Sequence, residues 1–309
     1  MLLRVDRHGA VTALRRSSLL LTMADAVPAF DPKLTLGALE IGVLISYCLF
    51  GLTTLQAYMY FQRFPQDHTS LKYLAGAVWC CELGHTICVG NTLYIMTISY
   101  YGQPERLLRT PASLLTSIIF SALVSALVQG FFSYRIYRLS NSLHVPSLFW
   151  GVAFVRLVLS LLASVEALRM VSLADYEQQW GWLLTTVWGI GAMNDLAIAG
   201  TIVYLIYKQQ SEILPKRTVA VLDKLMLWSI ETGMLTSVSG IAMLICFLTM
   251  RRNYIWLVIY VINTRFFSNA LLANLNSREA LRAMSEADIT IPDFTTDSSR
   301  SRSKSSRLR

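Results

Sequence analysis

A carboxylate and an imidazole stand in the middle of a long apolar run. The run extends from Leu71 to about Tyr100 and contains WCCELGHTICVG, in which Glu82 and His85 are three residues apart. On a helix this spacing places both side chains on one face. The pair suits either a site for a polar ligand or ion, or a structural ion-pair network.

Three more charged residues occur deep inside other apolar segments. Arg156 lies about nine residues into its segment, Asp195 about a dozen residues before the end of its segment, and Arg265 about eleven residues into its own. An ionisable residue at such depth in a membrane faces the bundle interior, because exposure to lipid is costly. We therefore expect two acids and two bases to share one central layer. Its secondary polar residues are Asn194, Asn263, Gln129 and, nearer one surface, Glu231.

This central layer has two interpretations, which can both hold. It is a midplane site for a ligand or ion, or it is a structural network that fixes the packing of the helices. Buried ion pairs are tolerated when they are hydrogen-bonded, and losing one partner is costly.

Enzyme chemistry has few groups to use. Membrane metal hydrolases need several His or carboxylate ligands at close range, but His85 is the only imidazole within an apolar segment. A retinal Schiff base requires a lysine inside a span, whereas Lys72 and Lys224 stand at segment edges. We expect no catalytic activity, no cofactor and no bound metal.

The composition indicates the elements that position these residues. Charged residues are 15 % of the chain, against about 25 % in typical globular proteins, and mean hydropathy is +0.47. Segments of about 20 apolar residues are long enough to span a bilayer as helices. The sequence therefore predicts an all-α bundle of seven transmembrane helices in an integral membrane protein. The segments are about 36–61, 72–98, 113–137, 147–170, 181–207, 226–249 and 254–275.

The chain divides into three parts. Residues 1–35 form an N-terminal lead, 36–277 the seven-helix domain and 278–309 a basic tail rich in Ser and Arg. Residues 1–22 carry four arginines that suit neither a signal peptide nor the topology below. We expect the native protein to start at Met23.

Lysine and arginine are distributed unequally between the two ends of the bundle, and cytoplasmic loops carry the excess. An N-terminus outside and a cytoplasmic C-terminus place the larger set inside. The inner set is Arg63, Lys72, Arg135, Arg138, Lys208, Lys216, Arg217, Lys224, Arg278 and Arg282. The outer set is Lys33, Arg106, Arg109, Arg169, Arg251 and Arg252. The sequence does not distinguish plasma membrane from endomembrane.

The tail TTDSSRSRSKSSRLR has too little apolar surface to fold. We expect it to bind anionic lipids, and Ser301, Ser303 and Ser305 are candidate phosphorylation sites that would release it. The net charge of +8 lies largely in loops and in this tail. It therefore predicts contact with the lipid bilayer and with an unknown cytoplasmic partner, and no nucleic acid.

Five stretches of the sequence carry a family resemblance: QAYMYFQRFPQD, RIYRLS, NDLAIAGTIVYLI, TGMLTS and NALLANLNSR. With them the chain resembles, over about 30–278, seven-pass membrane proteins of mushroom-forming fungi that carry a C-terminal domain of unknown function. The last three stretches are the most specific. The resemblance implies seven helices with the N-terminus outside, and it implies no established activity. The resemblance also implies Asp at the position of Glu82 and Asn at the position of Glu231. Glu82 keeps the carboxylate of that pattern, whereas Glu231 departs from the pattern by adding a charge.

Three functions fit these features. A receptor-like protein would use the midplane site, the basic loop before the sixth segment and the phosphorylatable tail. A transporter or channel for a small solute or ion would use Glu82, Asp195 and the two arginines, although no internal repeat is present. A structural or lipid-interacting membrane protein would need none of these groups.

Within the sixth segment, the spacing of Gly233 and Ser237 permits close helix contact, inside the bundle or in a dimer.

Overall fold

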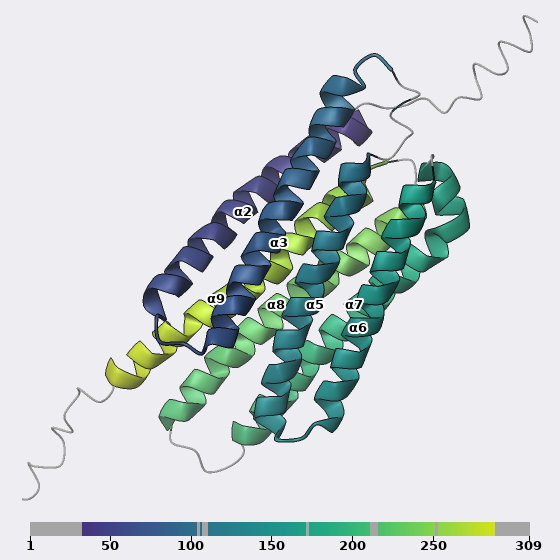
Figure 1. Cartoon of the computed structure of the whole chain (residues 1–309). Coiled ribbons are helices and arrows are strands. Elements are labelled where there is room, and N and C mark those ends of the chain that lie inside the picture. Colours follow the sequence, from purple (N-terminus) through teal and green to yellow (C-terminus); the bar gives the residue numbers. More distant parts are fainter. Residues whose placement is uncertain are drawn as a thin grey trace, which may run out of the picture.

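The computed structural model describes residues 33–103, 106, 111–170, 173–210, 216–250 and 253–287, and the regular structure in this part of the chain is helical. Within these described ranges, seven long helices run along one bundle (Figure 1). In chain order they are α2 Ala38–Arg63, α3 Thr69–Tyr94, α5 Ala112–Ser140, α6 His144–Arg169, α7 Leu173–Gln210, α8 Lys216–Thr249 and α9 Ile255–Ala287. Two π-helical turns, η1 Lys33–Gly37 and η2 Ile95–Ser99, adjoin α2 and α3.

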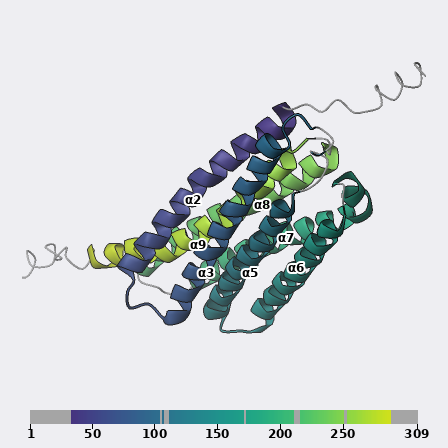
Figure 2. The ribbon, with the colours of Figure 1, turned by 45° about the horizontal axis from the view of Figure 1, so that its top comes forward.

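The seven helices form a closed ring. Each helix packs against the next one in the chain, and α2 closes the ring against α9. Contacts of α5 with α7 and α9, and of α3 with α9, cross the interior. Figures 1 and 2 show α2, α3 and α9 as one side of the bundle and α5, α6 and α7 as the other. The C-terminal ends of α2, α5, α7 and α9 lie at one end of the bundle, the α2–α3 end.

In the part of the chain that the structure describes, five helical segments are long and apolar enough to cross a membrane. They are Thr35–Arg63, Ala112–Ser140, His144–Arg169, Gln178–Lys208 and Ile255–Arg278. Within its described residues α8 contributes a shorter apolar segment, Gly233–Thr249. α3 is as long as α2 but carries polar groups inside the bundle, which lower its hydropathy.

The face of α3 that turns inward explains how Glu82 and His85 are tolerated. The buried residues recur every three or four positions, as one face of a helix requires. They are Ala75, Val78, Glu82, His85, Val89 and Thr92. The exposed face of α3 is uncharged and includes Tyr73, Ala77, Cys80, Ile87 and Tyr94. The helix therefore presents apolar groups outward and its carboxylate inward.

Three helices are longer than the sequence segments suggested. α7 begins at Leu173, eight residues before the expected segment 181–207. α8 begins at Lys216, directly after Pro215 in the sequence, and runs without a break to Thr249, so its first part precedes the apolar segment 226–249. α9 continues past the expected domain boundary at 277 to Ala287. None of the three helices contains a proline, the residue type that interrupts a helix most strongly, and α9 also contains no glycine.

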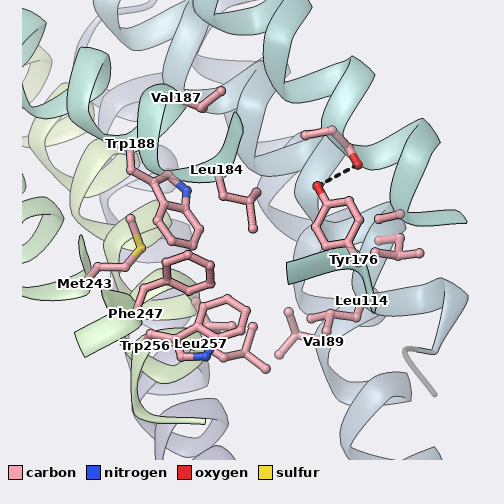
Figure 3. Packing of buried hydrophobic residues seen from close by; sticks show 14 of the residues in the cluster. Val89, Leu114, Tyr176, Leu184, Val187, Trp188, Met243, Phe247, Trp256 and Leu257 are labelled. Carbon is pink, nitrogen blue, oxygen red and sulfur yellow. Dashed lines mark hydrogen bonds between the residues drawn. The ribbon is translucent and has the colours of Figure 1, made fainter. Parts of the chain in front are cut away.

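An aromatic core joins α7, α8 and α9 (Figure 3). The ring centroids of Trp188 and Phe247 are 5.1 Å apart, and those of Phe247 and Trp256 are 5.4 Å apart, both in edge-to-face geometry. Such pairs contribute about 0.5–1.5 kcal/mol beyond the burial of their area. This core fixes the helices that form one wall of the polar site described next.

Candidate functional site

The four charged residues of the central layer lie at one depth. Glu82 is thirteen residues after the start of α3 at Thr69, and Arg156 is twelve after the start of α6 at His144. Asp195 and Arg265 are each thirteen residues before the ends of their apolar segments, Lys208 and Arg278. All four therefore lie about 20 Å from the α2–α3 end at 1.5 Å per residue. Equal depth does not bring them into one cluster, because the structure divides them into two sites.

The first site is a sealed ion pair between α3 and α9. The Nη1 atom of Arg265 donates to the carboxylate of Glu82, and both side chains are fully buried. Arg265 also donates from Nε to Ser46 Oγ over 2.8 Å and from Nη2 to Thr86 Oγ1 over 2.9 Å. The guanidinium lies 5.4 Å from the ring centroid of Phe50. One arginine thus joins α2, α3 and α9.

His85 is buried one turn from Glu82, on the same face of α3. Within the described part of the chain, neither ring nitrogen has a hydrogen-bond partner. The imidazole therefore faces the interior without joining the ion pair.

The second site surrounds Arg156 on α6. Its Nη1 donates to Ser125 Oγ on α5 over 2.6 Å, and its guanidinium lies 5.9 Å from the ring centroid of Phe267 on α9. The guanidinium also rests on the backbone of α7 at Gly191. A Cβ added there would lie 2.6 Å from Arg156 Cζ and 2.8 Å from Nε and Nη2. Glycine at this position therefore makes room for the cation.

Asp195 follows Gly191 by one helical turn and interacts electrostatically with Arg156. Its Oδ1 accepts a hydrogen bond from Nε2 of the buried Gln129 over 2.7 Å. Among the described residues, the ion pairs within 4.0 Å do not include one between Asp195 and Arg156. The carboxylate is thus a neighbour of the cation rather than its direct partner.

A cavity of about 50 Å³ lies against Arg156 in the middle of the bundle. Helices α5 to α9 all contribute to its wall, and the lining set contains no Asp or Glu. Trp188, Leu184 and Met243, which belong to the aromatic core in Figure 3, form part of this wall. The polar residues of the lining are Ser121, Ser125, Gln129, Arg156, Ser160, Tyr260, Asn263 and Thr264.

The remaining candidate residues have separate positions. Asn263 lines the cavity, and its Oδ1 accepts a hydrogen bond from Ser239 over 2.5 Å. Asn194 is buried, with its Nδ2 atom unpartnered among the described residues. Glu231 is exposed on α8 and belongs to neither site. Ser301, Ser303 and Ser305 lie outside the described residues, as do Met1–Thr22.

The small-residue spacing on α8 serves contact inside the bundle. A Cβ added to Gly233 would collide with the Cβ of Ala199 on α7. Ser237 is fully buried one turn further along α8. The close approach therefore joins α7 to α8, next to the turn that carries Asp195.

A row of two serines and one glutamine on α5 faces Arg156, and the sequence prediction did not include the two serines. Ser121, Ser125 and Gln129 recur every four residues on α5, which places them on one helix face. This spacing in SALVSALVQ was a readable signal, although serine in a membrane helix also serves close packing. The hydroxyl of Ser46, which supports Arg265, stands alone in an apolar run and gave no signal.

A second arginine–carboxylate pair was also missed, at the α2–α3 end. Arg278 Nη2 lies 2.5 Å from Asp67 Oδ2, and Tyr60 O–H donates to the same oxygen over 3.1 Å. The guanidinium of Arg278 stacks 4.6 Å from the ring centroid of Phe64. This cluster fastens the α2–α3 connection to α9.

Comparison with known proteins gives a family match over one part of the chain and no activity. Residues 191–280 match a family described as a family of unknown function (DUF6534). No curated protein matches the chain. The matched region holds Asp195, Asn263, Arg265 and Arg278, and also the three most specific stretches of the family resemblance. It is narrower than the expected 30–278, and it leaves out Glu82 and Arg156.

Proposed function

We propose that this protein is an integral membrane protein with seven spans and a receptor-like site for a small polar solute in the cavity beside Arg156. The observation that carries the proposal is the cavity itself. A cation lines a polar space in the bundle core, and no carboxylate lies within ion-pair distance of it among the described residues. A charge retained at that depth is a functional-site hypothesis by default.

The two helices beyond the five apolar segments support seven spans. α8 has 34 residues, about 51 Å of helix, which exceeds the roughly 30 Å of a bilayer core. From Gly233 to Thr249 its exposed large side chains are apolar, as contact with lipid requires, and the exposed Glu231 precedes this segment. These side chains are Met234, Leu235, Val238, Ile241, Ile245 and Leu248. α3 has the uncharged outer face described above. The resemblance to fungal seven-pass proteins agrees with this count.

The distribution of Lys and Arg supports placing the α2–α3 end in the cytoplasm. An epitope attached after Arg309 should then be stained only after cells are permeabilised. Staining on intact cells would overturn this orientation. The contact of the basic tail with anionic lipid stays a prediction, since residues 288–309 lie outside the described part.

The site is tested by solute-dependent stability of the full chain in nanodiscs. Thermal unfolding is measured with a panel of polar solutes of at most about four heavy atoms, which is the size the cavity admits. A solute at one hundred times its dissociation constant stabilises the folded state by about 2.7 kcal/mol. We expect at least one solute to do so.

Two variants test whether the solute stabilises the protein by binding in the cavity. Ala126→Val fills space in the cavity lining and should remove the stabilisation. Ala77→Val makes the same change on the exposed face of α3 and should leave it intact. Stabilisation that persists in Ala126→Val, or a panel without any stabilising solute, would contradict a binding role and leave the structural interpretation.

A receptor-like role requires a response at the cytoplasmic face. The stabilising solute should increase recovery of a cytosolic partner with the nanodisc-bound protein. Flux of the same solute into proteoliposomes, without such recruitment, would instead identify a transporter.

A further inference from the structure

We propose that the cavity beside Arg156 binds a small monovalent oxyanion, of the carboxylate or bicarbonate class. This assignment rests on the proposed function, and it adds the charge, shape and size of the ligand. Three features of the site carry it.

The first feature is the charge at the cavity wall. Arg156 is the one charged residue in the lining set among the described residues. Its neighbour Asp195 accepts from Gln129 and is not part of this lining. The cavity wall itself therefore carries one positive charge, and a solute with one negative charge would give Arg156 the direct counter-ion that Arg265 obtains from Glu82.

The second feature is the supply of hydrogen-bond donors. A guanidinium has five N–H donors in a planar fork that matches the two oxygens of a carboxylate. Within the described structure, the hydrogen bond of Arg156 goes to Ser125 Oγ, so that hydroxyl accepts and its own proton stays free to donate. Ser121 and Thr264 are already occupied, since they share one hydrogen bond of 2.8 Å and Thr264 Oγ1 also donates to the carbonyl oxygen of Tyr260 over 3.4 Å. The Ser125 hydroxyl and the fork together can therefore donate to an oxyanion.

The third feature is size. One water molecule needs about 10–15 Å³ of cavity measured with a water-sized probe. The cavity of about 50 Å³ thus holds roughly three to five non-hydrogen atoms. Formate, acetate and bicarbonate fit this space. A drug-sized ligand requires about 300–1,000 Å³ and does not.

Gly191 shows that the site is shaped around the cation. The guanidinium occupies the position that any larger residue at 191 would fill. The backbone of α7 thereby supports Arg156 from behind, while Ser125 holds it from α5. A cation held from two helices keeps its fork in one orientation, which favours a ligand of fixed planar shape.

Binding is tested with ¹⁴C-acetate and ¹⁴C-formate on the full chain in nanodiscs of neutral lipid. Equilibrium dialysis uses gluconate, which is too large for the cavity, to hold ionic strength constant. We expect saturable binding of both probes, competed by unlabelled bicarbonate and not by the neutral isosteres acetamide and formamide. Arg156→Gln should lower affinity by at least about tenfold, because a charge-assisted hydrogen bond is lost.

Matched variants separate the charge from the fold. Arg169→Gln removes an exposed arginine from the same helix and should leave acetate binding unchanged. Arg156→Lys keeps the charge without the fork and should bind with intermediate affinity. If Arg156→Gln does not fold, Ala126→Val still tests the site, because it occupies the cavity and leaves the cation in place.

Two results distinguish an incorrect assignment of the ligand's charge from the absence of a binding site. Acetamide that binds as tightly as acetate, with both lost in Ala126→Val, would overturn the oxyanion and keep the polar-solute site. The absence of saturable binding by charged and neutral probes alike would overturn both. Binding of chloride without binding of either carboxylate would overturn the planar oxyanion class.

Discussion

Two arginines at the same depth in this bundle have opposite surroundings. Arg265 is fully buried and meets the carboxylate of Glu82, two hydroxyls and an aromatic ring. Arg156 donates to one serine and lines a cavity whose wall carries no carboxylate among the described residues. The first environment supplies everything that a buried cation needs. The second leaves the charge of Arg156 without a direct counter-ion, which a bound solute would supply.

The difference teaches that depth alone does not reveal the role of a membrane charge. A charge with a direct counter-ion and full hydrogen bonding joins helices, and its removal leaves the partner buried and unpaired. A charge without a direct counter-ion joins helices weakly and is available to a solute. Substitution of Arg265 should therefore lower the free energy of unfolding, whereas substitution of Arg156 should lower the affinity for the solute.

The largest expected effect is on the sealed pair. Arg265→Leu leaves Glu82 buried without its cation, and the free energy of unfolding should fall by about 3–5 kcal/mol. Adding Glu82→Gln should restore part of that loss, because the uncompensated charge disappears. The measurement is equilibrium unfolding in detergent micelles, with Arg169→Leu at an exposed position as the control. A double variant no more stable than Arg265→Leu would show that Glu82 does not depend on this cation.

The next effect compares two glycines on neighbouring helices. Gly233→Ala presses a methyl group against Ala199, which cannot move aside without separating α7 from α8, so unfolding free energy should fall by about 1–3 kcal/mol. Gly191→Ala meets the end of the Arg156 side chain rather than a neighbouring helix, and a side-chain end is displaced at less cost than a packed helix. Helix propensity favours alanine by about 0.8–1.0 kcal/mol, so Gly191→Ala should change stability little.

The same pair of variants should separate in acetate binding. Gly191→Ala displaces the guanidinium from its position and should weaken ¹⁴C-acetate binding, whereas Gly233→Ala leaves Arg156 untouched and should retain it. Stability measured by thermal unfolding and affinity measured by dialysis would then respond to different glycines. Equal losses of affinity in both would contradict the role assigned to Gly191.

A smaller effect is expected for the cation beside the cavity. Arg156→Leu removes one hydrogen bond to Ser125 but also removes a charge that lacks a direct counter-ion. These changes oppose each other, and the free energy of unfolding should change by only about 1 kcal/mol. Chemical unfolding beside Arg265→Leu gives the comparison directly. A loss as large as that of Arg265→Leu would show that Arg156 is part of a structural network.

The sequence predicted the long helices because their signal is local. Apolar runs of about 20 residues and the three-residue spacing of Glu82 and His85 depend only on neighbours in the chain. The helix bounds agree with the expected segments except where helical sequence continues past the apolar part, as it does in α7 from Leu173, in α8 from Lys216 and in α9 to Ala287. Hydropathy marks the apolar part of such a helix and does not report where the helix itself begins or ends.

The sequence predicted the depth of the candidate residues but not the rotation of their helices, and that rotation divides them into two sites. Counting residues along each segment placed Glu82, Arg156, Asp195 and Arg265 in one layer, and the helix bounds agree. Which of them meet depends on how each helix is turned and on which neighbour it packs against. The α2–α9 contact that closes the ring joins segments about two hundred residues apart, so no local pattern reveals it. Ser46 supports Arg265 through that contact, and it was missed for that reason.

The smallest effect is expected at the α2–α3 end, where a third arginine occupies an intermediate environment. Arg278 pairs with Asp67 over 2.5 Å, but 31 % of its side chain is exposed. Partly exposed ion pairs contribute about 0.2–1 kcal/mol and are screened by salt. A double-mutant cycle with Arg278→Gln and Asp67→Asn isolates the coupling from the packing of Arg278 on Phe64. The coupling should fall between low salt and about 1 M salt, where the screening length is about 3 Å, while the cycle of Arg265 with Glu82 should keep its value. A coupling at Arg278 that ignores salt would show that this end of the bundle excludes water as the core does, and the contrast between the buried and exposed pairs would then fail.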